Sequence, residues 1–191
     1  MVTQAHDQPR RVSLSQAPPE RPRVAFLEWT APLFVGGHWT PQLIRMAGGS
    51  HPLNEAREGG GAGPSFAVEH AALREADPDW VVVCPCGLDL ATARRGVGDV
   101  VESDARRAGQ LCLQQSLSLP FACRRELGPL AREPWWADLR AVRAGRVVLV
   151  DGHQMFNRPG PRLVDALAFL VGLLHERCRG LMPRDFPWER L

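Results

Sequence analysis

The chain has 191 residues, which is enough for one domain with a sizeable apolar core. Hydrophobic residues make up 45% of it and charged residues 23%, the composition of an ordinary globular protein. The net charge of +2 excludes a strong electrostatic attraction to nucleic acid or to an anionic membrane surface.

Membrane and secretory segments are also not expected. The longest apolar run, 166–174, is far shorter than the roughly 20 residues of a membrane-spanning helix. Residues 1–20 contain no apolar segment, so we expect no secretory signal in the chain as given. The compartment stays open: cytoplasmic for the chain as written, periplasmic if an upstream part exists. An odd number of irregularly spaced cysteines does not indicate a disulfide framework; they are Cys84, Cys86, Cys112, Cys123 and Cys178.

The N-terminal third of the chain predicts a tail, a strand and a helix. Residues 1–22 are polar and contain prolines, which indicates a disordered tail. The apolar run 23–29 predicts a buried strand, and 30–39 predicts a loop. Thr40 followed by Pro41 predicts a helix start, and the helix is expected to end at the glycine pair 48–49.

The middle of the chain predicts a second helix and a second strand. Residues 50–64 are expected to form a surface loop, after which Ser65 is expected to cap a helix that reaches residue 76. The segment "WVVVCPCG" (80–87) predicts a strand because it is rich in β-branched residues, and residues 88–95 predict a helix.

The C-terminal part predicts a third strand and a long helix. Residues 96–132 show the least regular pattern, and a short helix is expected within 133–145. The segment "RVVLVDG" (146–152) predicts a strand, and leucines repeated along 161–177 predict an amphipathic helix.

This alternation of strands and helices predicts an α/β fold: a three-layer, doubly wound, mostly parallel sheet. In such sheets ligands bind beyond the carboxyl ends of the strands. The loops at those ends are 30–39, 85–89 and 151–160, so we expect any binding site there.

The side chains of these loops are of types that contact ligands. In the first loop, Trp29, Phe34 and Trp39 flank two glycines and His38, which offers flat apolar surface and close backbone approach. These aromatics could equally belong to the core. His38 is either a ligand contact or a structural histidine.

The second and third loops leave similar alternatives. Cys84 and Cys86 either fill a strand end or take a soft-metal or redox role; no metal-ligand spacing accompanies them. Asn157 and Arg158 could bind a ligand or cap the next helix. His153 is expected to be structural or solvent-facing, and Arg162 is expected to be solvated.

No catalytic arrangement emerges. The nucleophile-elbow, phosphate-loop and dinucleotide fingerprints are absent from the sequence. We therefore expect a binding protein, with no catalytic residues and no metal site.

Three blocks occur in order along residues 23–178: "RVAFLEWTAPLFVGGHWTPQLIRMAGG", "DPDWVVVCPCGLDL" and "WWADLRAVRAGRVVLVDGHQMFNRPGPRLVDAL". Together they resemble the C-terminal lobe of the class III periplasmic binding proteins, most closely the cobalamin-binding group, whose domain is shared with iron-siderophore binders. The resemblance implies a single lobe over 23–191, with 96–132 as an insertion.

The resemblance also implies a function. Members of the family hold a ligand between two α/β lobes joined by a long helix, deliver it to an ABC permease, and perform no chemistry. The implied ligand is cobalamin or another corrin or metal chelate, no cofactor is required, and a separate N-terminal lobe is an implied partner. The implied ligand-facing residues are Trp29, Phe34, His38, Trp39, Cys86, Gly87, Phe156, Asn157 and Arg158. Relatives present a carboxylate to the permease, for which Glu55 or Glu58 would serve.

Two alternatives remain at this stage. The lobe could be a protein-interaction module that lost its small ligand, since an open aromatic face would need a partner. The chain could also be a small metal- or thiol-dependent enzyme that uses Cys84, Cys86 and His38.

Overall fold

The computed structural model describes residues 21–57, 63–95 and 128–191. Most of the expected tail, Glu58 and residues 96–127 of the expected insertion therefore lie outside the described residues. The described strands are β1 (Val24–Thr30), β2 (Leu33–Val35), β3 (Phe66–Ala67), β4 (Trp80–Val83), β5 (Val147–Val150) and β6 (Trp188–Arg190).

The α-helices are α1 (Thr40–Met46), α2 (His70–Ala76), α3 (Leu90–Arg95), α5 (Gly128–Ala131), α6 (Arg140–Arg143) and α7 (Leu163–Leu174). The 3₁₀ helices are η1 (Trp136–Asp138), η2 (Met155–Asn157) and η3 (Glu176–Leu181). Within the parts of the chain that the structure describes, none of the helices is both long enough and apolar enough to cross a membrane.

The strands form one mixed six-stranded sheet in the order β3-β2-β1-β4-β5-β6. Its centre is the parallel set β1, β4 and β5, as the three apolar runs predict. β2, β3 and β6 extend the sheet through antiparallel pairs, so β1, β3, β4 and β5 point the same way and β2 and β6 point the other way. The α/β fold with a parallel centre is confirmed.

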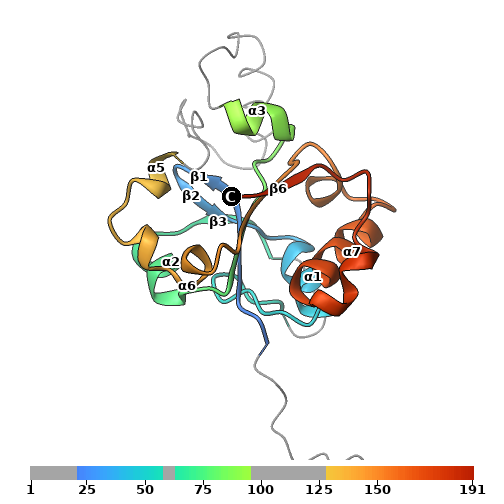
Figure 1. The fold of residues 1–191 in the computed structure, drawn as a ribbon, viewed down its shortest axis with the longest axis horizontal. Coiled ribbons are helices and arrows are strands. Elements are labelled where there is room, and N and C mark those ends of the chain that lie inside the picture. The colour runs from blue at the N-terminus through green and yellow to red at the C-terminus, as the bar shows by residue number, and fades with distance from the viewer. Residues whose placement is uncertain (1–20, 58–62, 96–127) are drawn as a thin grey trace, which may run out of the picture.

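Helices cover both faces of the sheet, which gives three layers (Figure 1). α1 and α7 lie on one face, and α2, α5 and α6 lie on the other. The strand residues alternate between the two cores: Val24, Phe26 and Val82 face α1 and α7, whereas Ala25 and Val81 face the other layer. This period of two allows both faces of each central strand to be buried.

Three local expectations were wrong. The loop expected over 30–39 contains β2, which turns back on β1 as a hairpin. The helix expected from Ser65 begins only at His70, because residues 66–67 form β3 and pair with β2. The last α-helix ends at Leu174 rather than at residue 177, and the chain continues as η3.

Candidate functional site

The loops that follow β4 and β5 are joined through their main chains at the carboxyl edge of the sheet. The amide of Gly87 donates to the carbonyl of Gly152 at 3.0 Å, and the amide of Gly152 donates to the carbonyl of Leu88 at 2.8 Å. A Cβ atom at position 152 would lie 1.7 Å from the carbonyl oxygen of Pro85, so only glycine permits this approach. The two loops therefore form one continuous surface.

The buried carboxylate of Asp151 stabilises this surface by accepting hydrogen bonds from two main-chain amides. Its Oδ1 accepts the amide of His153 at 2.9 Å, and its Oδ2 accepts the amide of Leu90 at 3.3 Å. The side chain is only 4% exposed, and burial without partners would be costly for a carboxylate. The sequence analysis did not single out Asp151. Its position directly after a predicted buried strand could have indicated a residue at the carboxyl end of the sheet.

The side chain of Asn157 stabilises the loop after β5 through a hydrogen bond inside the loop. Its Nδ2 donates to the carbonyl of Gly152 at 2.7 Å and to Sγ of Cys84 at 3.5 Å. The residue was expected to face a ligand, and the structure instead directs its amide nitrogen into the loop.

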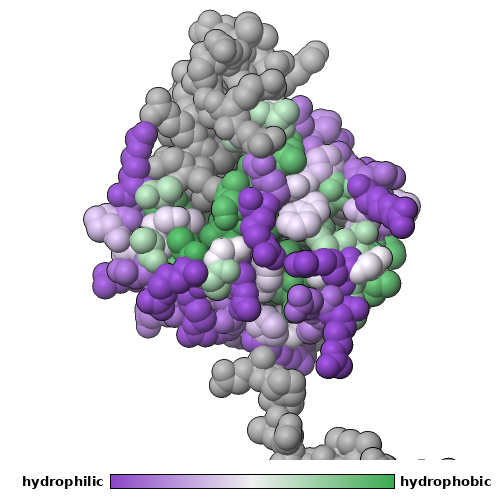
Figure 2. Space-filling view, viewed as in Figure 1, coloured by the Kyte–Doolittle hydropathy of each residue, from purple (hydrophilic) through white to green (hydrophobic). Residues whose placement is uncertain are grey.

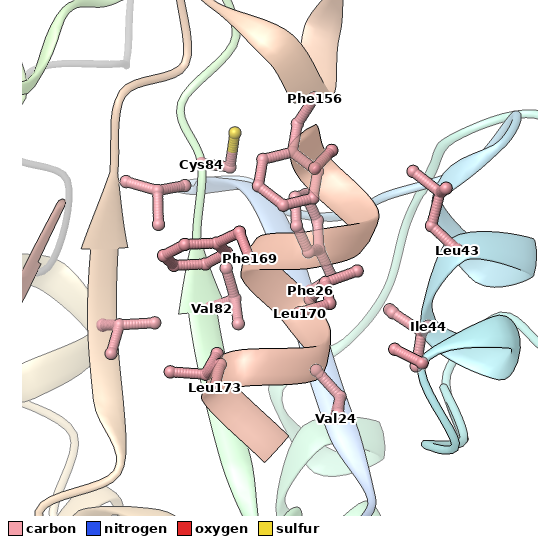
Figure 3. Close-up of a cluster of buried hydrophobic side chains, with 14 of the residues drawn as sticks. Val24, Phe26, Leu43, Ile44, Val82, Cys84, Phe156, Phe169, Leu170 and Leu173 are labelled. Atoms are coloured by element: carbon pink, nitrogen blue, oxygen red, sulfur yellow. The ribbon is translucent and has the colours of Figure 1, made fainter. Parts of the chain in front are cut away.

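Phe156 does not face outward, so the expectation that its side chain offers a ligand-facing surface was wrong. Its ring is 1% exposed and lies 5.0 Å from the ring of Phe26, between centroids. Phe169 and Phe186 also pack against it, each with centroids 5.9 Å away. Figure 3 shows the ring turned inward beside Phe26 and Phe169. Burial of this apolar ring in the core is more favourable than its exposure to water. The turn of η2 directs the ring into the core.

Trp39 and His38 are the aromatic pair next to the β5–α7 loop. Trp39 is half-buried, and its Nε1 donates to the carbonyl of Phe156 at 2.7 Å, which fixes the indole against that loop. The ring of His38 lies 5.7 Å from the indole ring, and the backbone of His38 has a φ of 53°. The amide of His38 donates to the carbonyl of Gly63. These contacts connect the segment after β2 with the loop after β5.

Trp29 and Phe34 form a separate pair. They lie opposite each other in the β1–β2 hairpin, next to a register irregularity, and both are half-buried. Among the ring contacts of the described residues, none joins this pair to His38 and Trp39. The structure therefore divides the expected aromatic surface into two pairs and one core residue.

The cysteines of the second loop differ in environment. Cys84 is fully buried, and this burial raises the pKa of its thiol well above the ordinary value, with the nearby charge of Glu28 acting in the same direction. Its thiol therefore stays protonated, which opposes a nucleophilic or metal-binding role. Cys86 is half-buried and Gly87 is exposed with a φ of 81°. In the described ranges no three His, Cys, Asp or Glu side chains group as metal ligands would.

Arg158 borders a groove of about 370 Å³ on the outer side of the β5–α7 loop. The groove is lined by residues 153, 154 and 158–162, so it includes His153 and Arg162, which the sequence analysis left to solvent. Nε of Arg158 donates to the carbonyl of His153 at 3.1 Å, and Nη1 of Arg162 donates to Oε1 of Gln154 at 3.0 Å. The basic side chains of the segment "HQMFNRPGPR" were the feature of the sequence that could have indicated this groove.

The surface of the lobe is mainly hydrophilic in the view of Figure 2, where hydrophobic residues appear in smaller areas among polar ones. Glu55, one of the two expected docking carboxylates, is exposed.

Comparison with known proteins gives a match at the level of structure. No family model matches the chain, and no curated protein matches it in sequence. A TroA-like periplasmic binding protein, FepB, from Veillonella parvula superposes with a TM-score of 0.54 at 12% identity, over 93% of this chain and 50% of that one. The periplasmic heme-binding protein BhuT, solved with two hemes, gives 0.50 at 21% identity over 83% and 46%. The vitamin B12-binding protein BtuF of Vibrio cholerae gives 0.48 at 15% identity over 84% and 46%.

The chain thus spans half or less of the length of these structures. Its six-stranded sheet, with helices on both faces, matches a lobe of such a protein. The chain has the fold of one lobe of a periplasmic binding protein.

Proposed function

We propose that this lobe binds a flat metal chelate of the corrin, porphyrin or siderophore kind at the carboxyl edge of its sheet. It acts without catalysis, as part of the substrate-binding component of an ABC importer, and a second lobe closes over the ligand. The observation that supports this most is the position of Trp39, whose indole is fixed to the β5–α7 loop and is only partly buried beside His38. A rigid indole at a sheet edge is suited to stacking against a flat ring.

The fold supports the same proposal. Ligands of open α/β sheets bind beyond the carboxyl ends of the strands, where the loops after β4 and β5 meet and where the indole of Trp39 is hydrogen-bonded to the second of them. Phe156 is excluded from the contact surface because it is buried, so the ligand contacts are proposed for Trp39, His38, Cys86, Gly87 and Arg158. Trp29 and Phe34 are proposed as a second contact area on the hairpin.

The proposal is tested by titrating the purified chain with cyanocobalamin and with iron(III) protoporphyrin, read by tryptophan quenching and by calorimetry. Trp39→Phe should weaken binding by about tenfold if the indole stacks on the ring, which corresponds to about 1.4 kcal/mol. The control is Trp135→Phe, because Trp135 is also half-buried and hydrogen-bonded, to Glu133, but packs in the opposite layer. Absence of any response with both ligands at millimolar concentration would overturn the assignment to corrin and porphyrin chelates.

A protein-interaction role is a second candidate, favoured by the aromatic side chains of Trp29, Phe34 and Trp39, which are only partly buried. Light scattering at high concentration and pull-down experiments separate the two roles. A strictly monomeric chain with no partner, and with chelate binding intact, would eliminate the interaction role.

A further inference from the structure

Two exposed arginines lie against one buried tryptophan at the amino edge of the sheet, which is the edge opposite the candidate site. Trp80 begins β4, Arg146 directly precedes β5, and Arg190 ends the antiparallel strand β6. The indole of Trp80 is 7% exposed, and the Cζ atoms of Arg146 and Arg190 lie 5.7 Å and 5.5 Å from its ring centroid. The core therefore fixes the indole, and the indole positions both guanidinium groups through cation–π contacts.

The register of the sheet makes the two arginines neighbours. Arg190 is paired with Val148, and Arg146 lies two residues before Val148, so the arginines occupy diagonal positions on adjacent strands. Side chains at such positions start about 7–8 Å apart, a distance that long side chains span. Val148 belongs to the core beside α1 and α7, so both arginines lie on that face of the sheet.

Among the residues that the structure describes, no carboxylate lies within ion-pair distance of this pair. The ion pairs of those residues involve other basic side chains, and neither Arg146 nor Arg190 donates a side-chain hydrogen bond to any of them. Glu189 precedes Arg190, but it is paired with Leu149 of the opposite core, so its side chain points to the other face. Two like charges held side by side repel each other, and a bound anion removes that repulsion.

We propose that Arg146 and Arg190 bind an acidic segment of a partner protein at the amino edge of the lobe. Exposed guanidinium groups hold a small anion only weakly in water, whereas a segment with several carboxylates can pair with both arginines at once. Arginines that are already stacked lose little side-chain freedom on binding, and arginine is enriched among the residues that dominate interface affinity. The inference does not rest on the proposed function, because the candidate site lies at the other edge of the sheet.

The test compares two dye-labelled peptides of equal length, an oligoglutamate and an oligoglutamine, by fluorescence anisotropy with the full chain. We expect the acidic peptide to bind about tenfold more tightly than the neutral one in low salt, and this difference to shrink in high salt because the arginines are exposed. Arg146→Gln and Arg190→Gln should each weaken binding of the acidic peptide roughly threefold to tenfold. The double glutamine variant should bind the two peptides equally.

Two controls separate this pair from the overall charge and from the fold. The variant with both Arg74→Gln and Arg132→Gln removes the same amount of charge from exposed positions of α2 and of the residue after α5, in the layer on the opposite face of the sheet (Figure 1). It should leave binding of the acidic peptide unchanged. Arg190→Lys keeps the charge and should retain more of this binding than Arg190→Gln does. Thermal melts check that each variant is folded.

Three results would overturn the inference. The first is equal binding of the two peptides by the wild-type chain, or a preference for the acidic peptide that persists in the double glutamine variant at positions 146 and 190. The second is an equal loss of binding in the control double variant, which would indicate attraction by the overall charge. The third is displacement of the acidic peptide by millimolar inorganic phosphate at constant ionic strength, which would indicate a site for small anions instead of a protein segment.

Discussion

Replacement of His51 by leucine should remove one component of the pH dependence of stability. The imidazole is 2% exposed, and among the described residues neither ring nitrogen has a hydrogen-bond partner of good geometry. Burial lowers the pKa of His51 from 6.5 to about 4, against a weaker opposing effect of the carbonyls of Gly36 and Phe26. The folded protein therefore holds this ring in its neutral form.

The direction of the effect follows from proton binding. Between pH 4 and pH 6.5 the unfolded chain protonates His51 and the folded chain does not, so the free energy of unfolding falls as the pH is lowered. The stabilisation is fully present above about pH 6.5 and is lost progressively as the pH falls toward 4. A pKa difference of about 2.5 units corresponds to roughly 3 kcal/mol across this range.

The assay is urea unfolding followed by tryptophan fluorescence at pH 7.5, 6.0, 5.0 and 4.5. Other groups titrate in both proteins, so the quantity of interest is the difference between His51→Leu and wild type at each pH. That difference should move by about 2.5 kcal/mol in favour of the variant between pH 7.5 and 4.5. The same substitution at the exposed His153 is the control. Parallel stability curves for His51→Leu and wild type would refute the reasoning.

Three further substitutions test the packing beneath the candidate site. Gly152→Ala places a Cβ atom against the carbonyl of Pro85 and should destabilise the fold by about 2 kcal/mol or more, whereas Gly180→Ala, with open space around it, should be nearly neutral; equal urea midpoints would contradict this. Phe156→Ala should cost roughly 3–5 kcal/mol in urea unfolding because the ring is buried in an aromatic cluster, and a loss below about 1 kcal/mol would show that the ring is not part of the core. Asn157→Ala removes one of the two donors to the carbonyl of Gly152, the amide of Gly87 being the other, and should cost about 1 kcal/mol, seen also as faster amide exchange in the loop; unchanged exchange would contradict a stabilising role for Asn157.

The central fold was predictable because its strands carry strong local signals. The three parallel strands are short, mainly apolar runs, of which β4 and β5 are largely β-branched, and such runs are buried on both faces in parallel sheets. The helix start at Thr40 was predictable because proline at the first turn suits a helix. These features depend on neighbours in the sequence.

The expectations that were wrong concern segments whose structure depends on contacts between residues distant in the sequence. Ser65 has the character of a helix cap, but its Oγ accepts the amide of Gly37 and donates to the carboxylate of Glu28. β2 and β3 have three and two residues, too few for a periodic pattern.

The candidate site was predictable in position but not in orientation. The edge of the sheet follows from the order of strands and helices, and so do the loops that lie there. Whether an aromatic or polar side chain in such a loop points outward depends on the path of the loop. Phe156 and Asn157 point inward because the chain turns through η2, and no local pattern encodes that turn.

The way the β5–α7 loop is held has a consequence for protein engineering. Its path depends on main-chain bonds to the β4–α3 loop, on Asp151 beneath it and on Asn157 within it. Positions 159, 161 and 162 contribute little to these bonds, so they could be randomised in a library to select lobes for new ligands while Gly160 and the backbone are kept. The loop would then act much like an antibody hypervariable segment, a variable surface on an invariant frame.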